Sequence, residues 1–369
     1  MRTRSWPLVV TAMMAAATAT ACGSDGGVAN QDQITFKYAT YQPENSTDAK
    51  VAKWWFERVD ELTPNHELDV KMFYSGSLLP PDDTLNGVAS RRADAALFAT
   101  SYHPKELPLS QIATVPFLST SAEASARVHA EMYENNEAFR EEFKRNGLVP
   151  LVWAVVPNNT LGFVDPVDSV DDLDGKKIRA VGISAQALEA KGAEVVALPA
   201  TDLYESLEQG VIEGFSTLIF TNAVLGFNVA EVAPNLVDSG LGQYVLATQV
   251  VMNADLYEGL PDEVKGAMGQ AAEEALDFSL KETQAEGELA CDRLQELGGS
   301  VTTFPEDEVS AWKDGLFEGL LDQWSESASE SPDLTEDAIE EFESEYLEAM
   351  SERSGEAAPD ILTECANRG

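Results

Sequence analysis

The chain has 369 residues, with 64 acidic side chains against 24 basic ones and a formal net charge of −40. This charge excludes nucleic acid as a partner, because a phosphate backbone is bound by clustered Lys and Arg. Spread over a surface, so many acidic residues favour solubility and fit a salty habitat.

The first residues have the order of an export signal. Two arginines precede a mostly apolar run from Leu8 to Ala17, and small residues then lead to Cys22. The run is too short to span a bilayer. We predict a signal peptide over residues 1–21, a Cys22 lipidated as in bacterial lipoproteins, and a flexible tether over residues 22–33. A plain secretory signal with an incidental cysteine is the alternative.

The chain after the tether begins as an α/β unit. In order, we expect a strand at Ile34–Thr40, a helix from Ser46 to Leu62, a strand at Glu67–Tyr74, a helix at Asp82–Arg91 and a strand at Ala93–Ala99. This alternation predicts a mostly parallel sheet covered by helices, which binds ligands beyond the carboxyl ends of its strands. The loops Tyr41–Asn45, Ser75–Ser77 and Thr100–Tyr102 therefore converge on one cleft.

A second α/β unit follows a long helix. We expect a helix at Ser121–Arg145, and further helices at Ala185–Lys191 and Thr201–Gln209. Strands are expected at Leu148–Val156, Ile178–Val181, Glu194–Leu198, Val211–Ile219 and Tyr244–Asn253. A further helix begins at Pro261 and reaches Leu297. It would be roughly 55 Å long at 1.5 Å per residue, which is enough to cross two domains.

Two cysteines remain if Cys22 carries lipid. An even pair in an exported protein favours a disulfide between Cys291 and Cys365, which would fasten the C-terminal tail to the long helix. Two free buried thiols are the alternative.

Signals of catalysis are weak along the whole sequence. The three histidines, His66, His103 and His129, have no metal-ligand spacing, and no nucleophile elbow, phosphate loop or dinucleotide fingerprint is present. We therefore predict no enzyme, no metal and no cofactor. His103 lies near the expected cleft and is interpreted as structural or ligand-lining.

Arg179 is the basic residue of most interest. It follows Ile178 on a short apolar strand of a very acidic chain. Such an arginine is either half of a structural ion pair or a clamp for a ligand, because a guanidinium group matches a carboxylate with two parallel hydrogen bonds.

Residues 171–214 (DDLDGKKIRAVGISAQALEAKGAEVVALPATDLYESLEQGVIEG) resemble the signature of TRAP-transporter (tripartite ATP-independent periplasmic) solute-binding proteins, the DctP-like family. That family shows a "dLkGlKiR" turn and strand, followed by an "l..lGa.pv.m...e.Y.aLq.GvvDG" segment. Tyr74–Leu78, Val115–Phe117 and Met252–Pro261 are similar to further motifs of the family, in the same order. The resemblance covers nearly the whole exported chain.

The resemblance implies a periplasmic-binding-protein-like fold of type II. Two α/β domains, with mostly parallel sheets and helices on both faces, would close around an organic acid, and a long helix would cross both. On this basis domain I is residues 34–152 with 241–278, domain II is 153–240 with 279–355, and 356–369 form a C-terminal tail. The "KiR" arginine pairs with the substrate carboxylate in the family, and this role carries over to Arg179.

Three positions depart from the family pattern. Thr217 follows Glu213–Ser216 where Asn is common, and Ala200 stands where an aromatic residue is frequent. Asn159 stands where sialic-acid binders have a further arginine, so sialic acid is not the expected ligand.

The predicted ligand-binding residues come from both domains. They are Arg179, Trp153, Tyr41, Thr100, Thr217, Asn159, Phe215 and Tyr102. For Tyr41, Thr100, Tyr102 and Trp153, packing or solvent exposure is the alternative.

The expected partners are a small organic acid and the membrane permease subunits of a TRAP transporter. We expect a monomer outside the cytoplasm that touches the membrane only through its lipid. An ABC-type receptor, a receptor that serves a sensor kinase and, less well supported, a lipid-anchored enzyme are the alternatives.

Overall fold

The computed structural model describes residues 33–119, 121–243, 245–354 and 360–368. The predicted signal peptide, Cys22, the tether up to residue 32, and residues 356–359 of the tail lie outside these described residues. None of the helices described is long and apolar enough to cross a membrane.

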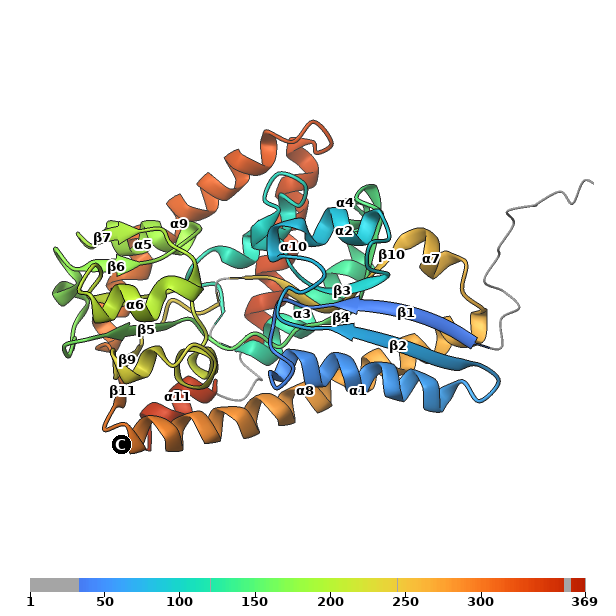
Figure 1. The fold of residues 1–369 in the computed structure, drawn as a ribbon. Coiled ribbons are helices and arrows are strands. Elements are labelled where there is room, and N and C mark those ends of the chain that lie inside the picture. The colour runs from blue at the N-terminus through green and yellow to red at the C-terminus, as the bar shows by residue number, and fades with distance from the viewer. Residues whose placement is uncertain (1–32, 120, 244, 355–359, 369) are drawn as a thin grey trace, which may run out of the picture.

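The first sheet has five strands (Figure 1, centre and right). Their spatial order is β2 (Glu67–Phe73), β1 (Gln33–Ala39), β3 (Ala95–Ala99), β10 (Ala247–Asn253) and β4 (Leu148–Trp153). β1 is parallel to β2 and β3, whereas β10 is antiparallel to both of its neighbours. The helices α1 (Thr47–Leu62) and α2 (Thr84–Ala89) connect the first three strands. This is the β-α-β-α-β order that the sequence predicts.

The second sheet has six strands (Figure 1, left). Their order is β11 (Ser300–Thr303), β9 (Asn235–Asp238), β5 (Thr160–Phe163), β8 (Gly214–Phe215), β6 (Lys177–Arg179) and β7 (Glu194–Val196). The short helices α5 (Ile183–Glu189) and α6 (Leu203–Glu208) accompany β6 and β7. β8 is much shorter than the strand expected at Val211–Ile219, because the chain leaves the sheet at Ser216.

Two extended segments connect the sheets, and they explain the antiparallel strands. The first crossing, residues 154–159, joins β4 to β5, and the second, after Asp238, joins β9 to β10. β5 and β10 each run antiparallel to both neighbours. β5 and β10 each begin at the junction between the sheets, because the chain reaches them from a crossing segment. Their neighbouring strands run in the opposite direction and end at this junction. The carboxyl ends of β1, β3 and β6 therefore face this junction.

Two helices extend over both sheets. The helix α8 (Asp262–Glu296) has 35 residues, which confirms the predicted helix between Pro261 and Leu297. Its N-terminal half packs on α1, and near the middle of α8 Trp54 stacks on Phe278 with ring centroids 4.7 Å apart. The helix α9 (Glu306–Ser329) places Trp312 in the core of the second sheet and Trp324 in that of the first.

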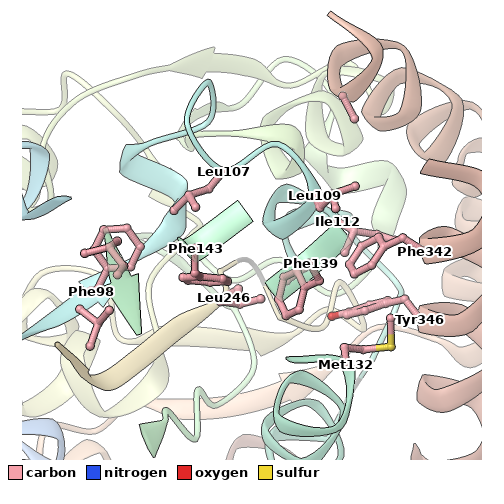
Figure 2. Packing of buried hydrophobic residues seen from close by; sticks show 14 of the residues in the cluster. Phe98, Leu107, Leu109, Ile112, Met132, Phe139, Phe143, Leu246, Phe342 and Tyr346 are labelled. Atoms are coloured by element: carbon pink, nitrogen blue, oxygen red, sulfur yellow. The ribbon is translucent and has the colours of Figure 1, made fainter. Parts of the chain in front are cut away.

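The helix α10 (Glu336–Ser354) belongs to the first sheet by its packing, which differs from the predicted assignment of residues 279–355 to domain II. Its residues Phe342 and Tyr346 lie beside Met132 and Phe139 in the largest apolar cluster (Figure 2). The residues between Lys313 and Arg353 include many acids and no base, and this charge pattern gave no signal of which core the helix covers.

Two helices stand where the sequence predicted one at Ser121–Arg145. They are α3 (Ala122–Asn135) and α4 (Glu137–Arg145), and they lie against β4. The break occurs at Asn136, whose Oδ1 accepts a hydrogen bond from the Phe139 N–H at 2.9 Å and so caps α4.

The end of the chain folds back onto the second sheet. The helix α11 (Ile361–Ala366) packs on α8 and β11, and Cys365 forms a disulfide with Cys291 across a Cα–Cα distance of 5.8 Å. The predicted tail is therefore a packed element over the residues described. The remaining helix, α7 (Ala254–Glu258), follows β10.

Candidate ligand-binding site

Arg179 is the last residue of β6, at the junction between the sheets. Its side chain donates hydrogen bonds to oxygens of three residues. The Nε–H donates to the Leu198 carbonyl at 2.9 Å, and Nη1 donates to the carbonyls of Ser216 and Thr217 at 3.0 Å and to the Thr217 hydroxyl at 2.8 Å. The residue is only 5% exposed. The guanidinium orientation is therefore fixed before any ligand arrives.

The loop that accepts these bonds is itself held by Asn159. Asn159 Oδ1 accepts from the Thr217 N–H at 2.6 Å, and Asn159 Nδ2 donates to the Ser216 hydroxyl at 2.8 Å. Thr217 has a positive φ of 54°, a conformation that is uncommon for a non-glycine residue and needs such support. Asn159 and Thr217 are thus brought to the site, where they shape the support of Arg179.

Two tyrosines of the first sheet lie at the same junction. Tyr41 follows β1, Tyr102 follows β3, and their rings meet edge to face at 6.1 Å. Tyr102 is 49% exposed. Partial burial raises the pKa of the Tyr102 phenol, the positive charge of Arg179 lowers it, and Asp82 raises it. The field of Arg179 therefore acts on a side chain of the opposite sheet.

Thr100, another predicted ligand-binding residue, has its side chain inside the packing. It is completely buried, and its hydroxyl donates to the Leu246 carbonyl at 3.1 Å. Its role is to tie the end of β3 to the residues before β10.

Phe215 is a core residue. It is completely buried next to Gly162, where an added Cβ would collide with the phenyl ring. Strand alternation explains the difference from the prediction, because β8 directs this side chain into the sheet packing while its neighbour Ser216 meets Asn159.

Trp153 lies outside the junction site as well. Its indole contacts a set of aromatic rings from α3 and α4, namely His129, Tyr133, Phe139 and Phe143. It also lines a surface groove of about 980 Å³ over β4. Arg179, Tyr41 and Tyr102 are not among the residues that line this groove. These contacts correspond to the packing alternative for Trp153.

Two buried histidines have structural surroundings. The His103 ring stacks on Phe98 at 5.1 Å, and burial lowers its pKa. His129 Nε2 lies 2.8 Å from the Tyr346 hydroxyl, and burial lowers its pKa to about 3. Among the residues described, no group of three or more His, Cys, Asp or Glu could hold a metal ion.

Comparisons with known proteins agree with this architecture. Residues 38–327 match the family described as "Bacterial extracellular solute-binding protein, family 7". The ectoine-binding periplasmic protein TeaA of Halomonas elongata is 25% identical over 303 residues, 79% of this chain and 84% of its own length. The 2,3-diketo-L-gulonate-binding periplasmic protein YiaO of Escherichia coli is 25% identical over 319 residues, 84% of this chain and 92% of its own.

Solved structures show the same fold. A TRAP solute-binding protein of Rhodoferax ferrireducens, crystallised with copurified benzoate, superposes with a TM-score of 0.75 at 18% identity, covering 88% of this chain and 100% of that one. A marine metagenome TRAP solute-binding protein specific for aromatic acids gives 0.74 at 21% identity, covering 87% and 99%.

The fold and the junction define a two-lobed receptor for a small solute. This chain belongs to the DctP family of bacterial extracellular solute-binding proteins, the binding component of TRAP transporters. It therefore acts outside the cytoplasm, and it binds its solute without transforming it.

Proposed function

We propose that this protein captures a small organic acid by its carboxylate at Arg179, between the two sheets, and delivers it to the membrane permease of a TRAP transporter. The observation that carries the proposal is the state of the guanidinium group. It is buried, oriented by hydrogen bonds at the carboxyl end of β6, and close enough to the opposite sheet to act on Tyr102. A cation fixed in this way is suited to recognise an anion.

The ligands named for related proteins support the class of solute. They include ectoine, a 2-oxoacid, 2,3-diketo-L-gulonate, benzoate and D-glucuronate, each of which carries a carboxylate group. Beyond that group they differ in size and polarity. A common carboxylate contact with a variable remainder of the site accounts for both facts.

Closure of the two lobes follows from this division. The carboxylate contacts Arg179 on the second lobe, while Tyr41 and Tyr102 cover the rest of the ligand from the first. A ligand that touches both lobes binds the closed form more tightly than the open one, and it shifts the population accordingly. In this proposal the first lobe is the first sheet with α1 to α4 and α10, and the second lobe is the second sheet with α11.

Cys22 is proposed as the lipid anchor of a monomeric receptor. Its place directly after small residues supports this assignment. In cells, Cys22→Ala should move the protein from the membrane fraction to the soluble one. Recovery of the variant in the membrane fraction would contradict the role of Cys22 as the anchor. This result would not bear on the proposal that the protein binds an organic acid.

A thermal-shift screen tests the binding function. The exported domain is screened with benzoate, 3-hydroxybenzoate, pyruvate, D-glucuronate and ectoine, next to Arg179→Ala. An acid at about one hundred times its dissociation constant adds roughly 2.7 kcal/mol to the stability, which shifts the midpoint visibly. We expect a shift with one class of acid that disappears in Arg179→Ala.

Arg127→Ala is the matched control, because Arg127 pairs with Glu123 on the surface of α3, outside the junction. It removes the same charge and should keep the shift. An acid-induced shift of equal size in Arg179→Ala would show that Arg179 does not bind the carboxylate.

A further inference from the structure

The C-terminal helix α11 is fastened to the long helix α8. The disulfide joins Cys365 to Cys291, and Ile361 packs so closely on Gly287 that any side chain at Gly287 would collide with it. Leu362 is completely buried in the core of the second sheet. At the lower left of Figure 1, α11 lies between α8 and this sheet. Its position is therefore fixed by covalent and apolar contacts.

From this position α11 contacts both segments that cross between the lobes. Asp360, the cap of α11, accepts a hydrogen bond from the Asn158 N–H of the first crossing at 3.1 Å. Thr363 donates to Asp238, where the second crossing begins, at 2.6 Å. One short helix thus joins α8 and both crossings on the side of the second lobe.

The contact with Asn158 leads directly to the Arg179 site. The next residue, Asn159, holds Thr217 and Ser216, and these two residues accept the hydrogen bonds of the Arg179 guanidinium. Every contact in this series lies in the buried interior, where small displacements are transmitted rather than absorbed.

We propose that Asp360 is a positioning residue for the Arg179 site, which acts by fixing Asn158 and thereby the place of Asn159 and the loop that orients the guanidinium. This inference rests on the proposed role of Arg179 as the carboxylate-binding residue. Asp360 lies outside residues 38–327, the part of the chain that matches the family.

Capping of α11 alone does not account for Asp360. One oxygen caps the helix by accepting from the Leu362 N–H at 3.0 Å, and Asn or Ser would do this equally well. Asp360 is 5% exposed and has Asp238 and Glu364 in its surroundings, so an ionised carboxylate here is costly. What a carboxylate provides beyond a cap is the second oxygen, which is bonded to Asn158.

Hydrogen exchange of two variants tests the proposal without any ligand. Asp360→Asn and Asp360→Ser each keep one oxygen for the cap and lose the second acceptor. We expect peptides that contain Thr217 and Asn158 to exchange about tenfold faster in both variants, corresponding to about 1.4 kcal/mol of lost protection. Peptides from β3 should exchange as in the wild type.

Gln284→Ala is the matched control, since it removes the α8 hydrogen bond to Glu364 of the same helix and leaves Asp360 intact. Exchange at Thr217 should not change in this variant. Unchanged exchange in both Asp360 variants, or an equal increase in Gln284→Ala, would overturn the positioning role.

Binding measurements separate this inference from the proposed function. For whichever of benzoate, pyruvate or D-glucuronate shifts the wild type, both Asp360 variants should weaken the affinity about tenfold. Affinity within twofold of the wild type would overturn the inference even if Arg179→Ala abolishes binding. If the Asp360 variants exchange faster at Thr217 but Arg179→Ala still binds the acid, Asp360 positions the loop as inferred. The proposed role of Arg179 in binding the carboxylate would then be wrong.

Discussion

The two sides of the junction are built from different interactions. On the second lobe, Arg179 is held by directional hydrogen bonds to a loop that Asn159 fixes in turn. On the first lobe, the rings of Tyr41 and Tyr102 meet edge to face, and Tyr102 is half exposed. In the proposed function, the charge of the solute is recognised by a rigidly supported group, whereas the half-exposed Tyr102 can adapt to the rest of the solute.

The largest effect is expected in the aromatic core behind the first lobe. Trp153→Ala removes an indole that packs on Phe139 and Phe143, and such truncations cost about 3 kcal/mol. The affinity for an organic acid should stay within twofold, because Trp153 lies outside the junction. Urea denaturation measures the first quantity and calorimetric titration the second. A large loss of affinity with unchanged stability would place Trp153 in the site after all.

Arg179→Lys tests the second lobe, where hydrogen bonds hold the guanidinium group. Lysine keeps the charge but cannot reproduce the planar fork or its bonds to Leu198 and Thr217. We expect an affinity about 100-fold weaker, which corresponds to about 2.7 kcal/mol, as measured by titration with an acid found in the screen. Affinity equal to the wild type would show that charge alone is recognised and that the support of the guanidinium is irrelevant.

Each lobe contains a buried carboxyl group whose ionisation contributes to how stability depends on pH. Burial raises the pKa of Glu142 in the first lobe and of Asp360 in the second to about 7 in each case, against roughly 4 when unfolded. Because the pKa of each carboxyl group is higher in the folded state, its contribution to stability is complete below the pKa of the unfolded state. This contribution is lost as the pH rises through the folded pKa of about 7. Between pH 7 and 5 the free energy of unfolding should increase by about 1.4 kcal/mol per pH unit for each group.

Denaturation at four pH values between 8 and 5 measures this slope. Glu142→Gln and Asp360→Asn should each make the slope of unfolding free energy against pH shallower. Surface acids change stability in the same direction, and because they remain in both variants they serve as an internal reference. A slope that neither substitution changes would show that these two carboxyl groups do not contribute to it.

The smallest effect on affinity is expected on the first lobe, at Tyr102. Tyr102→Ala removes one cover of the site and should weaken binding about fivefold, or about 1 kcal/mol, while changing the preference among acids. Titration of benzoate against pyruvate in the wild type and the variant shows the change in preference. A uniform loss for all acids would indicate that Tyr102 supports Arg179 and does not select the solute.

The sequence itself determined the class of protein and the order of its elements, and it supplied the hypothesis that Arg179 binds the solute. Periodicity predicted β1 to β3, because a strand imposes a repeat that a single chain displays, and helix start and stop signals predicted the extent of α8. The spaced motifs around Arg179 identified the family, and an even pair of cysteines indicated the bond between Cys291 and Cys365.

Only the tertiary structure decided which face each side chain occupies and which lobe each late helix covers. Trp153, Thr100 and Phe215 stand at plausible points of the sequence, yet their side chains are directed into packing or into backbone hydrogen bonds. The same holds for α10, which packs on the first sheet, and for Asp360, which meets Asn158 from 202 positions away. Such contacts join residues that are distant in the chain, and local patterns carry no information about them.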